Sequence, residues 1–186
     1  VAKMAEQIAQ GVEAVEDCKA VIRCVPEVST TTEQSEDEIP QQGPPYASQQ
    51  DLIDCDGLIL GSPSYFGNMA APLKYFIDNT SQVWLSGNLI GKPAAVFTAA
   101  SSLHGGHESL LLNMMIPLLH HGMIISGIPY SEQALQKTRS GGTPYGASHL
   151  AGSNGQPLSD DEISLCRTLG RRVAELAIKL GPVNRA

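Results

Sequence analysis

The amino-acid sequence predicts an α/β fold in which helices cover both faces of a parallel sheet. Short apolar segments typical of buried strands alternate along the chain with longer segments whose apolar residues recur at helical spacing. The alternation continues toward the end of the chain, without internal repeats. The 186 residues suffice for one such domain and are too few for two. We therefore expect residues 1–186 to form a single domain.

Four segments are predicted strands because they are short, apolar and bounded by glycine, proline or polar residues. They are residues 19–25, 57–61, 93–99 and 122–128. Helices are predicted where apolar residues fall on one face of a helix. They are residues 1–12, 49–54, 70–82, 107–121 and 159–180. The last helix has Ser159 as its expected N-cap and Glu162 three residues later, which is the pattern of a capping box.

The first predicted helix has no Ser, Thr, Asp or Asn before it, so the printed sequence starts inside a helical pattern. We expect a strand upstream of this helix, which would bring the number of strands to five. Five parallel strands alternating with helices are typical of the flavodoxin-like doubly wound fold, with strand order 2-1-3-4-5. On pattern alone, a shortened Rossmann-type sheet fits nearly as well.

Composition and charge narrow the function classes. The formal net charge of −7 disfavours nucleic acid as a partner, because nucleic-acid-binding surfaces are normally basic. No apolar run reaches the ~18 residues of a membrane-spanning helix. The four cysteines show neither a C-x-x-C pair nor metal-ligand spacing, so we expect no metal site, and reduced thiols in a cytoplasmic protein. Acidic residues and prolines in residues 29–46 predict a long surface loop.

Three segments leave predicted strands at the carboxyl edge of the sheet, where such folds bind ligands. They are residues 62–68, 99–106 and 127–130. The first two are rich in small residues, which let a flat ligand approach the backbone. The chain has no G-x-x-x-x-G-K-[ST], G-x-G-x-x-G or G-x-S-x-G motif, so ATP hydrolysis, Rossmann-type dinucleotide binding and serine-hydrolase chemistry lose support. The aromatic residues of the first segment favour a stacked planar cofactor instead.

Each candidate residue also has a purely structural interpretation. Tyr65 and Phe66 could pack against the helix that follows them. Ser101, Ser102 and Gly105 could form a helix-entry turn in which the hydroxyl groups cap the helix. Histidines at residues 120–121 lie at the end of a helix, where the helix dipole stabilises them, and they point to different faces, so they are a poor metal pair. Trp84, the one tryptophan, is of a type that more often anchors a core or an interface than contacts a cofactor.

Four motifs together resemble a known family. They are G-x-P-x-x-F-G-N-M at residues 61–69, H-G-G-x-E at 104–108, H-H-G-M at 120–123 and G-G-T-P-Y-G-A at 141–147. Over essentially its whole length, the chain resembles the flavodoxin-like NAD(P)H:quinone oxidoreductases of the WrbA family, which is named after tryptophan-repressor binding. The resemblance implies two-electron reduction of quinones by NADH or NADPH through bound FMN, and a homotetramer built as a dimer of dimers.

The resemblance also implies roles for individual residues. Val1 would be the last residue of a loop that holds the FMN phosphate, and Trp84 would reach from a neighbouring subunit to wall the substrate pocket. His120 would contact the flavin, and it would either stabilise charge near the flavin or supply a proton to the quinone. The flavin ring would lie between two further segments, formed by Ser64, Tyr65 and Phe66, and by Ala99, Ala100, Ser101, Ser102, Leu103, His104 and Gly105. Many members carry arginine in place of Tyr65, so substrate or nicotinamide preference can differ at that position.

Two other functions compete with this one. The first is a one-electron carrier of the flavodoxin type, which binds protein partners and has no pocket for a small substrate. The acidic charge slightly favours it, whereas the Trp84 region and residues 141–147 resemble the oxidoreductases. The second is a regulatory DNA-binding protein, which an acidic chain does not support. The sequence does not distinguish NADH from NADPH or identify the quinone.

Overall fold

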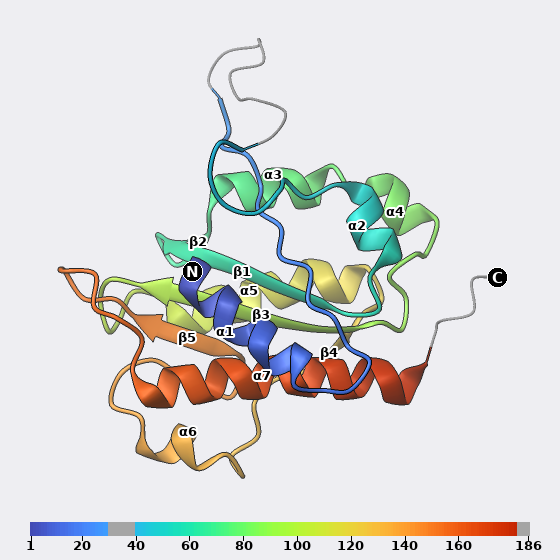
Figure 1. Cartoon of the computed structure of the whole chain (residues 1–186). Coiled ribbons are helices and arrows are strands. Elements are labelled where there is room, and N and C mark those ends of the chain that lie inside the picture. Colours follow the sequence, from blue (N-terminus) through green and yellow to red (C-terminus); the bar gives the residue numbers. More distant parts are fainter. Residues whose placement is uncertain (30–39, 182–186) are drawn as a thin grey trace.

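The computed structural model describes residues 1–29 and 40–181 of the chain (Figure 1). Its helices and strands alternate along most of this length. In chain order they are α1 (Ala2–Glu13), α2 (Gln49–Asp54), β1 (Leu58–Tyr65), β2 (Asn68–Met69), α3 (Ala71–Asp78), α4 (Ser81–Leu85), β3 (Pro93–Ala100), α5 (His107–His120), β4 (Ile124–Ile125), α6 (Gln133–Lys137), β5 (Ala147–Leu150) and α7 (Asp160–Leu180).

The sheet is centred on β3, whose eight residues are all buried. Strand β1 lies parallel to β3 along one side, in a register from Leu58–Ala94 to Pro63–Ala99. On the other side of β3, β4 pairs with its beginning and β5 with its end, both in parallel. The two short strands thus share one edge of β3. Strand β2 folds back antiparallel onto the end of β1.

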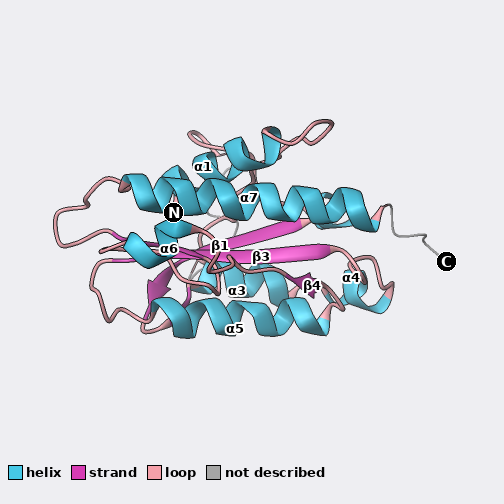
Figure 2. Cartoon of the chain, turned by 90° about the horizontal axis from the view of Figure 1, so that it is seen from below, coloured by secondary structure: helices cyan, strands magenta, loops and turns pink. Residues whose placement is uncertain are grey.

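Helices cover the sheet on both faces, as Figure 2 shows: α1 and α7 lie on one face, and α3, α4 and α5 on the other. Side chains of β3 alternate between these layers because successive residues of a strand point to opposite faces. Ala94 and Val96 join the core under α5, whereas Ala95 and Phe97 join the core under α7. This two-layered burial is the doubly wound architecture that the sequence predicts.

Helices α1 and α7 pack backbone to backbone. A Cβ atom added to Gly11 would collide with the main chain of Arg167, and one added to Gly170 would collide with the carbonyl oxygen of Ile8. Helix α7 begins with the expected capping box: the Ser159 side chain accepts from the Glu162 amide, and the Glu162 carboxylate accepts from the Ser159 amide. Among the described residues, no helix combines the length and apolarity needed to cross a membrane.

The predicted strand at residues 19–25 is wrong. The structure has an extended segment there with one isolated bridge, in which Cys24 N donates to Pro45 O at 3.1 Å and Ala47 N donates to Cys24 O at 2.7 Å. The chain facing Cys24 includes Pro44 and Pro45, and neither has an N–H to extend a ladder. Residues 30–39 of the predicted loop lie outside the described part.

Other boundaries differ for local reasons. The predicted strand 122–128 has two strand residues, Ile124–Ile125, and the glycine-rich segment 140–155 contains the unexpected strand β5. Helix α6 was also not predicted. The predicted helix 70–82 is two helices, because Thr80 ends the first by donating its hydroxyl to Ile77 O at 2.7 Å. The strand expected upstream of residue 1 stays a prediction.

Candidate functional site

The first candidate segment is a β-hairpin rather than an open loop. Strand β1 continues to Tyr65, and the chain turns at Phe66 and Gly67 before β2 returns. Both turn residues have positive φ, 52° for Phe66 and 73° for Gly67, as a tight hairpin turn of type I′ requires. The turn directs both aromatic side chains into solvent: Tyr65 is 60% exposed and Phe66 is fully exposed. Phe66 therefore does not pack against the following helix, and Tyr65 keeps most of its surface in solvent.

The second candidate segment follows β3. Ala99 and Ala100 are buried as the last residues of this strand, whereas residues 101–104 are exposed. The turn ends at Gly106, whose φ of 84° lets the chain enter α5. His107, the first residue of α5, is buried, and its Nε2 lies 3.1 Å from Ser102 O. This contact fastens the exposed turn to the start of the helix.

The hairpin and the second segment touch each other. Ser64 Oγ donates to Gly105 O at 2.5 Å, which links residues 41 positions apart. A Cβ atom added to Gly106 would lie 2.6 Å from Gly67 Cα, so the start of α5 and the hairpin tip meet through two glycines. The structure therefore brings the Ser64–Phe66 and Ala99–Gly105 segments together at the carboxyl edge of β1 and β3, as a cofactor site of this fold class requires.

Val1 lies apart from these contacts but at the same end of the sheet. It precedes α1 and packs on the core beneath α7. Figure 1 shows the amino terminus near the β1–β2 end of the molecule.

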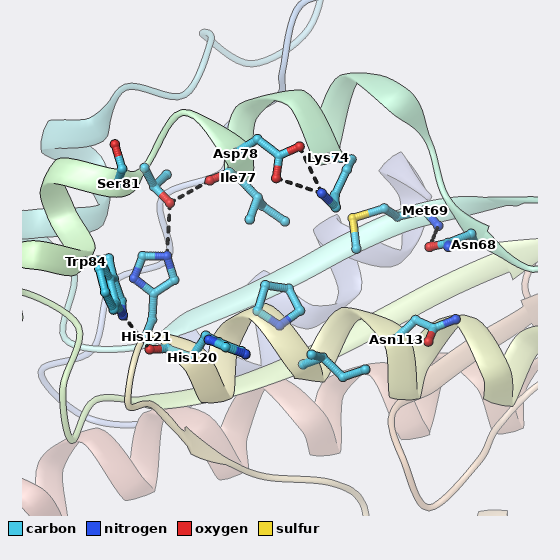
Figure 3. Close-up of a pocket in the computed structure, with 13 residues that line it drawn as sticks. Asn68, Met69, Lys74, Ile77, Asp78, Ser81, Trp84, Asn113, His120 and His121 are labelled. Atoms are coloured by element: carbon cyan, nitrogen blue, oxygen red, sulfur yellow. Dashed lines mark hydrogen bonds and ion pairs between the residues drawn. The ribbon is translucent and has the colours of Figure 1, made fainter.

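Trp84 and His120 form a second cluster. Trp84 Nε1 donates to His120 O at 2.9 Å, and both side chains line a groove of about 550 Å³ (Figure 3). The groove runs between α3 and α5 from β2 to the end of α5. Its lining residues are Asn68, Met69, Lys74, Ile77, Asp78, Thr80, Ser81, Trp84, Asn113, Ile116, Pro117, His120 and His121.

His121 is held in a fixed orientation beside this cluster. The Thr80 hydroxyl gives its proton to Ile77 O, so it accepts from His121 Nε2–H at 2.9 Å (Figure 3). Burial, followed by the neighbouring His120, lowers the pKa of the His121 ring. The Nδ1 of this ring is buried, and no group in residues 1–29 or 40–181 forms a hydrogen bond with it.

The two clusters lie at opposite ends of α5. The helix has 14 residues from His107 to His120, which at ~1.5 Å per residue separates its ends by about 20 Å. His107 adjoins the Ser64–Gly105 contact, whereas His120 adjoins Trp84. One chain therefore does not gather all the predicted site residues around one point.

The groove contains residues that the sequence interpretation missed. Asn113, Ile116 and Pro117 were missed, and they recur at helical spacing with the predicted His120 along one face of α5. The spacing shows that these residues share one face of the helix. Because α5 is apolar on most sides, the sequence does not reveal that this face borders a groove. Lys74 and Asp78, joined by an ion pair at 2.7 Å, carried no signal beyond ordinary helix spacing.

Comparison with known proteins identifies the family. Residues 2–134 match the family described as NADPH-dependent FMN reductase. The chain belongs to this family. It is 43% identical over 187 residues to a protein of Syntrophobacter fumaroxidans named NAD(P)H dehydrogenase (quinone), covering 96% of this chain and 91% of the relative. A protein of Geobacter sulfurreducens with the same name is 40% identical, covering 96% and 92% of the two chains.

Solved structures of other proteins show the same fold. A WrbA-like flavodoxin from Agrobacterium tumefaciens has a TM-score of 0.65 and 22% identity, covering 96% of this chain and 90% of that protein. A flavodoxin from the domain Archaea has a TM-score of 0.58 and 16% identity, covering 95% and 90%. The flavodoxin-like class is therefore confirmed, although the sheet is mixed because β2 is antiparallel.

Proposed function

We propose that this chain reduces quinones by two electrons, with NADH or NADPH as the electron donor and FMN as the cofactor. The observation that carries the proposal is the contact of Ser64 with Gly105, which joins the hairpin and the exposed turn into one platform at the carboxyl edge. The family description, FMN reductase, and the relatives' name, NAD(P)H dehydrogenase (quinone), support the same chemistry.

The residues of this platform fit a flat, partly apolar cofactor. Tyr65 and Phe66 present largely exposed rings, and residues 101–104 present an exposed turn beside them. Small residues leave main-chain groups accessible, so the turn can donate to the polar edge of a flavin ring. FMN, when bound, supplies the group that accepts and returns a hydride.

The chain's own side chains would orient substrates and move a proton. Aromatic rings at the hairpin tip would exclude water from one side of the site. His120, exposed at the groove, would supply a proton to the reduced quinone oxygen. Trp84, half exposed beside it, offers a flat wall against which a quinone or nicotinamide can stack.

A second copy of the chain would complete the site. Because Trp84 and His120 lie about 20 Å from the hairpin along α5, they would serve the platform of a neighbouring subunit. The helices on this side carry exposed apolar side chains, which favour burial between subunits. These are Tyr75, Trp84, Leu85, Leu112, Ile116 and Leu119. We expect a homotetramer, a dimer of dimers, acting in the cytoplasm with its four cysteines free.

Turnover with a purified, FMN-loaded protein tests the proposal. Oxidation of NADH or NADPH should depend on added benzoquinone, and it should stop when FMN is removed from the protein. A one-electron carrier would keep a stable FMN spectrum but show no such turnover. Absence of turnover with intact FMN would reject the enzyme, and a protein that stays colourless after FMN addition would reject the cofactor.

A further inference from the structure

A buried histidine is bonded to the exposed turn of the platform. His107, the first residue of α5, is 6% exposed, and its Nε2–H donates to Ser102 O at 3.1 Å. A carbonyl oxygen only accepts hydrogen bonds, so Nε2 carries the hydrogen in this contact. Gly105 N donates to the same oxygen at 3.0 Å, and Gly105 O accepts from Ser64 Oγ. The turn is thus fastened at Ser102 and at Gly105, on either side of its exposed tip.

The turn offers free main-chain donors. In the part of the chain that the structure describes, the N–H groups of residues 101–104 form no hydrogen bond, and the four residues are exposed. Successive free N–H groups in a turn can bind an anion or another hydrogen-bond acceptor. The directions of these donors depend on the φ and ψ angles of the turn. A bond that fixes Ser102 therefore also fixes the directions in which the neighbouring N–H groups can donate.

The second ring nitrogen of His107 shows that packing alone does not explain this residue. Its Nδ1 is buried, and within the described chain it has no hydrogen-bond partner. A buried polar atom without a partner destabilises the folded state, whereas a leucine of similar volume would fill the space without that cost. Ser102 O would still accept from Gly105 N after such a change. Folding therefore gains little from the ring, and its contribution is the bond to the turn.

We infer that His107 is a positioning residue for FMN, which acts through Ser102 by holding the N–H groups of residues 101–104 in the orientation that binds the polar edge of the flavin. The inference rests on the proposed function, because it places FMN against this turn. Without the Nε2 donor, Ser102 O keeps its bond inside the turn and loses its bond to α5. The turn then adopts several shapes, and FMN binding should weaken by about tenfold, the order of one net hydrogen bond.

Three substitutions in the full chain separate the Nε2 donor from packing. His107→Gln places an amide N–H near the position of Nε2, His107→Asn places one near the position of Nδ1, and His107→Leu keeps only apolar volume. In flavin fluorescence titrations, the FMN dissociation constant of His107→Gln should stay close to that of the wild type. It should rise about tenfold in the Asn and Leu variants. In chemical denaturation without FMN, His107→Leu should be at least as stable as the wild type.

Amide NMR of the FMN-free chain reports on the turn itself. Order parameters for residues 101–105 should show a rigid turn in the wild type and in His107→Gln. His107→Leu should show increased motion on the picosecond-to-nanosecond timescale in the same residues, because the turn has lost its bond to α5. This measurement needs no cofactor, so it tests the role of His107 independently of FMN binding.

The possible outcomes distinguish this inference from the proposed function. Wild-type FMN affinity in His107→Leu would overturn the inference, and so would equally weak binding by the Gln and Leu variants. A rigid turn in FMN-free His107→Leu would overturn it too, and a large loss of stability in that variant would assign the ring to folding instead. A wild type that binds no FMN would overturn the proposed function and the role of His107 in FMN binding, while the NMR measurement still decides whether His107 orders the turn.

Discussion

The two ends of α5 carry the predicted site residues, but they are built in different ways. At the amino end, the platform depends on main-chain contacts: Ser64 with Gly105, and Gly67 with Gly106. At the carboxyl end, the Trp84–His120 cluster depends on side chains around an open groove. Larger side chains at the amino end should therefore disturb the fold and the platform. Substitutions at the carboxyl end should leave the fold intact and lower only the catalytic activity.

Gly106→Ala should have the largest effect. The new Cβ would meet Gly67 Cα at 2.6 Å in a left-handed conformation, so the hairpin must move away from α5. We expect FMN binding to be lost and the free energy of unfolding to fall about 1–3 kcal/mol further than in the control. Gly155→Ala is that control, because it has a similar φ of 64° with nothing nearby. Equal losses in denaturant titrations of both variants would contradict the contact.

His120→Ala should lower kcat by about 100-fold, the scale of a lost general acid, while the protein stays folded and keeps FMN. The side chain is exposed in the groove, and the contact with Trp84 uses the backbone carbonyl, which the variant retains. Steady-state kinetics and the flavin spectrum together measure this. Unchanged kcat would remove His120 from the proton transfer.

Ser64→Ala should weaken FMN binding several-fold and lower the free energy of unfolding by about 1 kcal/mol, because the Gly105 carbonyl loses its donor. Ser109→Ala is the matched control, since that exposed hydroxyl bonds Gly106 O within its own helix turn. Flavin fluorescence titration and chemical denaturation report the two effects. If both variants bind FMN equally, the Ser64 contact does not shape the platform.

The smallest expected effect is on the free energy of unfolding at mildly acidic pH. Because burial lowers the pKa of His121 below its unfolded value of 6.5, the unfolded chain binds the proton more readily. Stability should therefore fall as pH drops through the unfolded pKa, and level off below the folded one. His121→Gln should show less of this loss in denaturation curves between about pH 7 and 5. Identical slopes would show that His121 carries no such linkage.

Motifs and periodicity predicted the architecture and the family, and the comparisons confirm both. Helices α1, α2, α5 and α7 have strong apolar spacing or caps, so local signals sufficed. Strand β5 was missed because its neighbours, Gly141, Gly142 and Gly146, are typical of turns. In the structure a Cβ on Gly146 would strike the main chain of Val96, so the glycine permits close packing against β3.

The candidate site was only partly predictable. The adjacency of the hairpin and residues 99–105 follows from parallel topology, since carboxyl ends of neighbouring strands share an edge. The separation of His120 from that edge follows from the length of α5, which the sequence also predicts. The family resemblance nevertheless placed His120 at the flavin, because it does not say which subunit's flavin the histidine contacts. The contacts of His149 with Glu162 and Gln156 join β5, a turn and α7, and no local pattern predicts contacts of that range.

Complementation between two defective chains tests most directly whether one site is made from two copies. Phe66→Asp alters the exposed hairpin tip of one chain, and His120→Ala removes the proton donor of the other. Co-expressed and co-purified, these chains should regain benzoquinone-dependent NAD(P)H oxidation well above either alone, because a mixed pair contains one intact site. A mixture no more active than the mean of the two separate variants, despite proven co-assembly, would contradict the shared site.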